Sequence, residues 1–372
     1  MKAFLFSPYF PDNFGGGEKY LLDVARVLAQ SKSCQVEVAI ASEEDLSQGE
    51  LGKIKKKYAQ FFNFDLSNLA FVNTPLGSKG NLLKKTLWTK KYDLGFYLTD
   101  GSLFYSMAKK NILHIQVPLK LDKSGYFNKL KLKSWHKITT NSEFTKSIVE
   151  PSWGIQVDEA HQPLVDIEPL LKSVNLQQKE KIILNVGRFF PQLHSKRQDI
   201  LVTIFTRLIK KHPRELRGWR LVLVGGAENL EYAQRVAQLA EGLPIEIIHG
   251  ANYEQVCDWY RRASIYWHAT GYRVNEEDEP EKVEHFGIST VEAMAAGCVP
   301  VVIAKGGQRE ILTDELARWS WLTQRDCMKK TKQLIRQPKI RLEAQKAAQE
   351  KSRQFGPKLF QQKLANLIRN DN

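Results

Sequence analysis

The stretch IILNVGRFFPQLHSKRQDILVTIFTRLIKKHPRELRGWRLVLVGG, residues 182–226, decides the fold class. It contains two short apolar runs that each end in glycine, and between them the segment 197–211 shows helical spacing of its apolar residues. Short apolar strands that alternate with helices are typical of a parallel sheet covered on both faces. The stretch therefore predicts a strand–helix–strand unit of an α/β sheet.

The same alternation extends on both sides of this stretch. Towards the C-terminus, we expect helices at 228–241, 253–262 and 290–296 and strands at 245–248, 264–267 and 299–303. The N-terminal half shows it more weakly, with strands expected at 3–6, 36–40, 94–97, 112–115 and 137–140 and a helix at 18–30. The pattern predicts two α/β halves, each a doubly wound parallel sheet.

The length of 372 residues agrees with two domains. We place them at 1–165 and 166–350, and we expect a C-terminal helix within 351–372 that packs back on the first domain. Ligands of doubly wound sheets bind outside the carboxyl ends of the strands. The expected site is therefore a cleft between the two domains.

Composition excludes several classes of protein. With 42% hydrophobic and 26% charged residues, the chain is globular and neither disordered nor fibrous. The four cysteines are far apart without a CxxC pair, which disfavours a disulfide scaffold or a structural zinc site and indicates a reducing compartment. No apolar run approaches the length of a membrane-spanning helix, and the one at the N-terminus is too short for a signal peptide.

The positive charge is concentrated in two regions. The formal net charge is +14, from 55 Lys and Arg against 41 Asp and Glu. Residues 51–150 carry 18 basic and 6 acidic residues, and the tail 329–372 carries 12 and 3. Such an excess is typical of proteins that bind nucleic acid or an anionic membrane. The segments 84–91 and 126–137 interleave basic with aromatic residues, but no nucleic-acid recognition motif is present.

The strongest motif is EHFGISTVEAMAAGCVPVV, residues 284–302. Its two glutamates, Glu284 and Glu292, are separated by seven residues. Ser289 and Glu292 fit a capping box at the start of a helix, and backbone N–H groups at such a terminus attract a diphosphate or a sugar hydroxyl. A purely structural explanation stays open for both glutamates, since Glu292 fits a capping residue and Glu284 fits the end of a solvated acidic run, 276–281.

Two cations flank a loop in NVGRFFPQLHSKRQD, residues 185–199. Arg188 and Lys196 follow a strand that ends at Gly187, at the edge of the sheet where ligands bind. Cations placed there hold a diphosphate and neutralise a departing phosphate. Arg197 competes with Lys196 for this role, and a solvated basic loop is the structural alternative.

Two weaker motifs lie in the N-terminal half. In PYFPDNFGGGEKY, residues 8–20, three glycines lie between a strand and a helix, where backbone can approach a ligand closely. The motif does not match the GxGxxG dinucleotide fingerprint, so a plain strand–helix turn fits it equally well. In NILHIQVP, residues 111–118, His114 lies inside an apolar strand, where a packed core residue is the more common alternative to a catalyst.

Together and in this order, the motifs resemble the retaining glycosyltransferases of family GT4, which have the GT-B fold. The matching segments are GGGEKY, VGRF with its following Lys, LVLVGG, EHFGISTVE, EAMAAGCVPVV and GGQREI, and the likeness covers nearly the whole chain. The EHFGI form is also similar to that of eukaryotic mannosyltransferases that build lipid-linked oligosaccharides. The resemblance implies two Rossmann-like domains that face each other across a cleft.

The resemblance also implies a role for each motif. The donor-binding residues that it implies are Gly16, Gly17, Arg188, Lys196, Phe286, Gly287, Ile288, Ser289 and Glu292. Among these, Arg188 and Lys196 would hold the diphosphate, the backbone of 286–289 would contact the donor sugar and phosphate, and Glu292 would bind the ribose hydroxyls. The two glycines would approach the diphosphate and the acceptor.

The implied activity is that of a hexosyltransferase. The donor would be a UDP- or GDP-sugar, and the acceptor a glycan or a lipid-linked molecule. Glu284 would contact the transferred sugar, His114 would lie near the reacting centre, and the segment 248–250 matches the base-contacting loop. Transfer would retain the anomeric configuration by a front-face mechanism, with no metal and no other cofactor.

Two other interpretations stay open at this point. A sugar-nucleotide epimerase or a phosphorylase of the same fold would be expected to lack the paired glutamates. A basic protein that binds nucleic acid or membrane would leave both the glutamates and the glycine loop unexplained. Under the favoured interpretation, we expect no nucleic-acid partner. The basic residues of 51–150 and of the tail 329–372 are expected to face an anionic membrane or acceptor, with 82–91 on the bilayer. A merely solvated basic face is the alternative. The expected location is the cytoplasm, peripherally at the inner face of the membrane.

Overall fold

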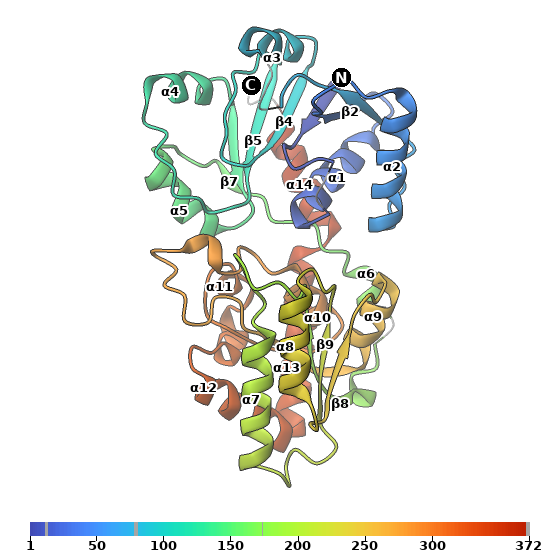
Figure 1. Cartoon of the computed structure of the whole chain (residues 1–372), viewed down its shortest axis with the longest axis vertical. Helices are drawn as coiled ribbons and strands as arrows, with labels where there is room; N and C mark the ends of the chain where they lie inside the picture. Colours follow the sequence, from blue (N-terminus) through green and yellow to red (C-terminus); the bar gives the residue numbers. More distant parts are fainter. Residues whose placement is uncertain (12–13, 78–80, 173, 370–372) are drawn as a thin grey trace. The chain divides into compact units, whose positions relative to one another are not determined.

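The computed structural model describes residues 1–372 except 12–13, 78–80, 173 and 370–372 (Figure 1). The chain forms two compact units: unit 1 comprises Met1–Leu164 and the segment from Phe360 onward, and unit 2 comprises Val165–Leu359. Within unit 2, the backbone N–H of Val165 donates to the carbonyl of Phe355 at 3.3 Å. The first and last segments of unit 2 therefore lie side by side.

The sheet of unit 1 has seven parallel strands in the order β3-β2-β1-β4-β5-β6-β7. The strands are β1 (Lys2–Phe6), β2 (Gln35–Ile40), β3 (Leu69–Asn73), β4 (Leu94–Thr99), β5 (Lys110–Ile115), β6 (Lys137–Thr140) and β7 (Glu159–Ala160). The order in which strands run outward from β1 to both sides is that of a doubly wound sheet. The predicted sheet is confirmed, and β3 and β7 are two strands that the sequence analysis did not find.

Helices cover both faces of this sheet and form a separate core on each. They are α1 (Gly16–Ala29), α2 (Gln48–Phe62), α3 (Leu82–Thr89), α4 (Tyr126–Leu132), α5 (Glu143–Trp153) and α14 (Pro357–Ile368). One core joins strand residues to α1, α2 and α14, and the other joins them to α5 and the segment around Trp135. The C-terminal α14 thus belongs to unit 1, where it buries Phe360, Leu364 and Leu367. The sequence analysis expected one helix within 351–372, whereas the structure ends α13 (Pro338–Ser352) and begins α14 there.

The sheet of unit 2 has five parallel strands in the order β10-β9-β8-β11-β12. The strands are β8 (Glu180–Val186), β9 (Arg220–Val224), β10 (Ile245–Ile248), β11 (Ala263–His268) and β12 (Val299–Val302). The remaining helices are α6 (Glu168–Leu171), α7 (Gln198–Lys211), α8 (Leu230–Ala240), α9 (Tyr253–Arg262), α10 (Ile288–Ala295), α11 (Gln308–Ile311) and α12 (Gln324–Arg336). All five strands predicted for this half are confirmed. They could be recognised in the sequence because parallel strands that are buried on both faces have continuous apolar runs.

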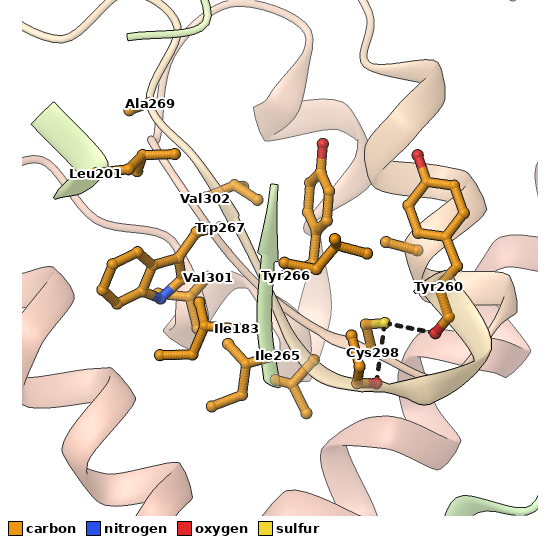
Figure 2. Packing of buried hydrophobic residues seen from close by; sticks show 14 of the residues in the cluster. Ile183, Leu201, Tyr260, Ile265, Tyr266, Trp267, Ala269, Cys298, Val301 and Val302 are labelled. Carbon is orange, nitrogen blue, oxygen red and sulfur yellow. Dashed lines mark hydrogen bonds between the residues drawn. The ribbon is translucent and has the colours of Figure 1, made fainter. Parts of the chain in front are cut away.

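Strand β11 lies in the middle of the unit 2 core. Figure 2 shows Tyr266 and Trp267 on opposite sides of the strand, and both are fully buried. The indole N–H of Trp267 donates to Thr331 at 3.0 Å, and the thiol of Cys298 lies 3.2 Å from the carbonyl of Tyr260. Because these buried polar groups have partners, they can be packed without a large desolvation cost. The core therefore holds the carboxyl end of β11 in a fixed position.

Candidate active site

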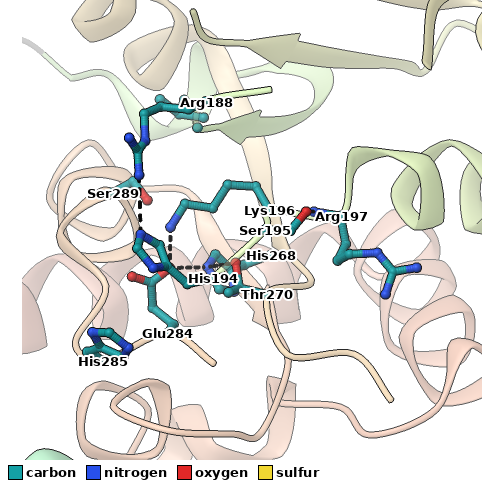
Figure 3. Close-up of polar contacts among 12 residues, drawn as sticks. Arg188, His194, Ser195, Lys196, Arg197, His268, Thr270, Glu284, His285 and Ser289 are labelled. Carbon is teal, nitrogen blue, oxygen red and sulfur yellow. Dashed lines mark hydrogen bonds and ion pairs between the residues drawn. The ribbon is translucent and has the colours of Figure 1, made fainter. Parts of the chain in front are cut away.

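Polar side chains gather where the neighbouring strands β8 and β11 end (Figure 3). The loop that follows β8 carries Lys196, and β11 itself ends at His268. Glu284 lies beyond a further loop, 271–283, and precedes α10. The carboxyl ends of parallel strands share one edge of a sheet, so residues that are 88 positions apart in the chain meet there.

Glu284 is the centre of this group. Its Oε2 accepts a hydrogen bond from Lys196 Nζ at 2.5 Å and lies 2.8 Å from His268 Nε2. Thr270 Oγ1 lies 3.1 Å from the same imidazole nitrogen. The side chains of Lys196 and Glu284 are 14% and 13% exposed, and His268 is not exposed. The carboxylate is therefore fixed by two neighbours while it keeps a narrow opening to solvent.

The environment sets the protonation states of this group. Burial alone would raise the pKa of Glu284, but the Lys196 ammonium and the hydrogen bond from His268 outweigh it and hold that pKa well below its usual range. Burial lowers the pKa of His268. Glu284 is thus ionised and His268 neutral at neutral pH, with the Nε2 proton donated to the carboxylate. His268 Nδ1 is then left buried without a hydrogen-bond partner among the described residues.

Arg188 lies at the more exposed side of the same edge. Its Nη1 donates to both carboxylate oxygens of Glu228, at 3.2 and 3.0 Å, and its Nη2 lies 3.3 Å from His194 Nε2. Burial, and then the charge of Lys196, lowers the pKa of His194 to about 3, so this imidazole is neutral and accepts from the guanidinium. Arg188 and Lys196 thus lie on two sides of the group around Glu284.

The described residues contain no cluster of three or more His, Cys, Asp or Glu placed to hold a metal ion.

Arg197, the alternative to Lys196 as the second cation, points elsewhere (Figure 3). Its guanidinium pairs with the Asp199 carboxylate through two contacts of 3.1 Å and also donates to the carbonyl of Tyr272 at 3.3 Å. It lines a separate pocket together with Tyr272 and Lys282. Of the two cations that the sequence left open, Lys196 is the one that reaches Glu284.

The predicted capping box at the start of α10 is wrong. The residue that caps this helix is Gly287, with φ of 123°, and no side chain makes a capping hydrogen bond. Ser289 lies inside the first turn, where its Oγ accepts from the hydroxyl of Tyr266 at 2.8 Å. A Cβ on Gly287 would approach Gln308 Nε2 to 2.4 Å, which the glutamine side chain can relieve by moving, so it is the backbone angle that requires glycine here. Phe286 is buried and packs against Phe355, with ring centroids 5.6 Å apart, so only its backbone is available to a ligand.

Glu292 therefore needs another explanation than helix capping. Its Oε2 accepts from the hydroxyl of Tyr260 at 3.0 Å, and its Oε1 lies 3.5 Å from that of Tyr253. Burial, and then the nearby Glu292, raises the pKa of both tyrosines, so the phenols stay protonated and act as donors. The sequence analysis missed these two tyrosines, which come from α9 and orient the carboxylate.

Glycines bring the loops of this site close together. A Cβ on Gly187 would lie 2.6 Å from Lys196 Cγ, so the lysine chain crosses directly over this residue. A Cβ on Gly225 would lie 2.0 Å from the carbonyl oxygen of Gly187. On the other side, the N–H of Gly307 donates to the carbonyl of Glu284 at 2.9 Å. Gly225 of LVLVGG and Gly307 of GGQREI thus position the loops that carry Lys196 and Glu284.

The segment 248–250 begins at the last residue of β10, at the same edge of the sheet. His249 Nδ1 lies 3.0 Å from the carbonyl oxygen of Gly225, and its ring packs edge-on against Phe189 at 4.7 Å. His249 is thus the residue of this segment whose side chain contacts the loops around the site. The role of the segment 248–250 in contacting the base remains a prediction, which names no single residue.

Gly16 and Gly17 form the first turn of α1 in unit 1. Gly15 caps the helix, and its N–H donates to Glu18 Oε2 at 2.7 Å. Part of the predicted glycine loop, residues 12–13, lies outside the described residues. A Cβ on Gly17 would lie 2.8 Å from Gln116 Oε1, so the side chain that neighbours these glycines comes from just after β5.

His114 is packed inside unit 1 and is not exposed. Its ring stacks on Tyr20, with centroids 4.1 Å apart, and its Nδ1 lies 2.8 Å from Thr139 Oγ1. Burial, and then His161, lowers its pKa well below the usual range. Its Nε2 is buried without a hydrogen-bond partner among the described residues, so His114 is not a fully satisfied core residue, and its role near the reacting centre stays a prediction. Gln116, which the sequence analysis did not consider, is a partly exposed polar residue directly after the same strand.

The histidines of this core predict a loss of stability in mild acid. Burial lowers the pKa of His161 to about 4, and its Nδ1 lies 2.7 Å from the hydroxyl of Tyr20. The unfolded chain binds this proton below about pH 6.5, so stability falls as pH drops from there to about 4, by about 3 kcal/mol for this group. We expect urea midpoints followed at several pH values to show a flatter dependence for His161→Gln than for the unchanged protein. Parallel curves would contradict the assignment.

The sequence is similar to those of known glycosyltransferases. Residues 166–351 match the family model described as "Glycosyl transferases group 1". Curated relatives include the GDP-Man:Man(3)GlcNAc(2)-PP-Dol alpha-1,2-mannosyltransferases of Neurospora crassa, 25% identical over 46% of this chain, and of Xenopus tropicalis, 29% identical over 40%. These alignments cover 33% and 29% of the two relatives, so the chain matches about a third of their length.

Solved structures resemble the whole chain. A glycosyltransferase from Rickettsia africae aligns with a TM-score of 0.72 at 16% identity, covering 100% of this chain and 99% of that one. Anabaena Alr3699/HepE, in a complex with UDP and glucose, aligns with a TM-score of 0.66 at 17% identity, covering 99% and 98%. These likenesses and the two parallel-sheet units establish the GT-B fold. With half of its length matched by the family model, the chain belongs to the group 1 glycosyl transferases.

Proposed function

We propose that this protein transfers a hexosyl residue from a nucleoside-diphosphate sugar to a glycan or lipid-linked acceptor, with retention of configuration and without a metal ion. The observation that carries the proposal is the Lys196–Glu284 pair at the carboxyl edge of the unit 2 sheet, which combines a buried carboxylate with a cation. Family membership supports the reaction class, since the matched segment includes both residues.

Departure of the nucleoside diphosphate creates negative charge, which the site is built to stabilise. Lys196 uses one of its three N–H groups on Glu284, so others remain for phosphate oxygens. Arg188 is half-exposed and can turn from Glu228 towards a diphosphate, and the backbone of 286–289 lies at the start of α10. Cations and oriented N–H groups at a leaving group lower the barrier because they are already in place when the charge develops.

The proposed role of Glu284 as a ligand of the transferred sugar is supported by the way its carboxylate is held. Oε2 is bound by both Lys196 and His268, so the carboxylate is fixed in position. A fixed carboxylate suits a hydrogen bond from a sugar hydroxyl. We propose retention by front-face transfer, in which the departing phosphate takes the acceptor proton, because the motifs of the chain resemble those of retaining glycosyltransferases. In this proposal His268 is a positioning residue, since it acts through Glu284.

The donor we propose is GDP-mannose, and the acceptor a lipid-linked glycan. Support comes from the curated relatives, whose names give GDP-Man as donor and a PP-Dol-linked glycan as acceptor. UDP-glucose is the second candidate, because a structural neighbour was solved with UDP and glucose. We further propose that the reaction takes place at the cytoplasmic face of a membrane, which the four unpaired cysteines support.

The experiment that tests this proposal is transfer from a panel of nucleotide sugars to lipid-linked acceptors, with the product's anomeric configuration read by NMR. We expect one nucleotide family to serve as donor, retention in the product, and unchanged rates in EDTA. An inverted product or a rate abolished by EDTA would contradict the proposed mechanism. Conversion of the donor without an acceptor would instead identify an epimerase.

Glu292 predicts how the nucleotide is held. We expect Glu292→Gln to weaken binding of the preferred nucleoside diphosphate by about 10–100-fold, because a carboxylate bonded to ribose hydroxyls is replaced by a neutral amide. The 2′,3′-dideoxy analogue lacks these hydroxyls, so wild type and variant should bind it equally in calorimetry. Glu231→Gln, an exposed position on α8, is the matched control. An equal loss for both nucleotides in Glu292→Gln would refute the ribose contact.

A further inference from the structure

Unit 1 exposes an unusual number of large apolar side chains in one region. Fifteen such side chains are exposed among the described residues, and eight of them come from three short segments, 82–87, 105–107 and 126–130. The eight are Leu82, Leu83, Leu87, Tyr105, Met107, Tyr126, Phe127 and Leu130. Phe127 is 76% exposed and Leu83 66%. Contiguous exposed apolar surface of this kind marks an interaction site.

Hydrogen bonds join the three segments into one surface. The N–H of Met107 donates to Thr89 Oγ1, in the last turn of α3, at 2.8 Å. The N–H of Ser106 donates to Ser134 Oγ, just after α4, at 3.1 Å. Ser106 is buried between Tyr105 and Met107, which are exposed, so this extended segment turns its apolar side chains outward. Figure 1 shows α3 and α4 in the same part of unit 1.

The same surface is strongly basic. The segments 82–91, 105–107 and 126–133, which we call the lysine–leucine surface, contain seven lysines and no aspartate or glutamate. Burial, and then the charge of Lys131, lowers the pKa of Lys85, so lysines of α3 and α4 are close enough to repel each other. Such repulsion is relieved when an anionic partner covers the surface.

The packing of the aromatic residues decides which anionic partner fits. A single-stranded nucleic acid binds by stacking its bases on exposed aromatic rings. Trp88 packs against Phe4 and Tyr92, with centroids 5.3 and 4.8 Å away, and Trp135 is 4% exposed. Tyr105, Tyr126 and Phe127 are exposed, but no nucleic-acid recognition motif accompanies them. Half of the exposed apolar side chains are leucines, which insert among acyl chains but do not stack on bases. A lipid bilayer therefore fits better than a nucleic acid.

We infer that the lysine–leucine surface docks the protein on an anionic lipid bilayer. The leucine and aromatic side chains enter the boundary between headgroups and acyl chains, and the lysines remain among anionic headgroups. No helix in the described parts of the chain is long and apolar enough to cross a bilayer. This inference rests on the membrane location proposed above and deepens it by naming the surface that makes the contact, and it needs neither donor nor acceptor.

The test is sedimentation of the full chain with vesicles of pure phosphatidylcholine and with vesicles in which a third of the lipid is phosphatidylglycerol. We expect binding to the anionic vesicles that weakens at high salt. The double variant Lys84→Glu, Lys129→Glu should bind at least about 25-fold more weakly, because each lysine near an anionic bilayer contributes about fivefold in affinity. Leu83→Ser with Phe127→Ser should also reduce binding. All four side chains are exposed, so folding is not at risk.

Matched controls lie on unit 2. Lys329→Glu with Lys346→Glu and Leu230→Ser with Leu239→Ser change exposed residues of the same types and should leave vesicle binding unchanged. Nucleoside diphosphate binding, measured by calorimetry, should be the same in all variants, so failure of docking and failure of the proposed reaction are separable. Absence of anionic vesicle binding, equal loss in the controls, or an oligonucleotide that outcompetes vesicles would overturn the inference.

Discussion

The Lys196→Met variant is expected to lose about 10²–10³-fold in kcat, the usual effect of removing one preorganised group that stabilises a leaving group. Methionine keeps the length of the chain that crosses Gly187 but removes the charge beside Glu284. The loss should appear in kcat at saturating donor, because the negative charge on the diphosphate grows as the sugar departs. Initial rates of transfer measure it.

Two comparisons make this result interpretable. Lys211→Met changes an exposed lysine at the end of α7 and should keep full activity. Thermal unfolding of Lys196→Met should show a folded protein of reduced stability, since Glu284 loses its cation in a mostly buried place. Our assignment fails if Lys196→Met retains wild-type kcat while Arg197→Met loses it.

Replacing Gly225 by alanine should destabilise unit 2 by about 3 kcal/mol or more, the upper part of the range for overpacking. The added Cβ would lie 2.0 Å from the carbonyl oxygen of Gly187, and backbone cannot yield as a flexible side chain does. In a unit of this size, that destabilisation lowers the melting temperature by about 6–12 °C. Calorimetry of the purified variant measures the shift.

The neighbouring glycine is a close control for this prediction. An added Cβ on Gly226 meets nothing within 4 Å, and its φ lies outside the left-handed region. Gly226→Ala should therefore leave the melting temperature within about a degree or two of wild type, as for an ordinary surface change. Equal shifts in the two variants would mean that the close approach of the β8 and β9 loops is not what requires glycine.

The sequence predicted the fold best where strands are buried on both faces. The strand 137–140 and the helix 253–262 agree with the structure at both ends. Helices α2 to α4 were missed, because they carry several lysines and few or no buried residues mark a helical period. Helix α5 was also missed, and it contains Pro151, which is atypical of a helix interior. Strand β7 has two residues, too few for any alternation to be visible. The hydrophobic pattern of the sequence thus fails to predict an element that forms through tertiary packing and shows no clear periodicity of its own.

The candidate site was only partly predictable. Motif order pointed to Lys196 and Glu284, but no local rule separates Lys196 from Arg197, since the choice depends on which way a loop turns. His268 had a usable signal, because it is a polar residue directly at the end of a buried strand. The tyrosines around Glu292 had none, since they come from α9 and meet the carboxylate only through tertiary packing.

Because the two ends of unit 2 lie side by side, this unit can be exchanged between related chains as one segment. Val165 and Phe355 are hydrogen-bonded, so a segment cut before 165 and after 356 has its two ends close together, as domain insertion requires. The final helix stays with the host, because α14 completes the core of unit 1. Chimeras between related chains should therefore have two crossovers, one on each side of unit 2, so that unit 1 keeps its own α14. A single crossover near residue 165 would combine unit 1 of one chain with α14 of the other.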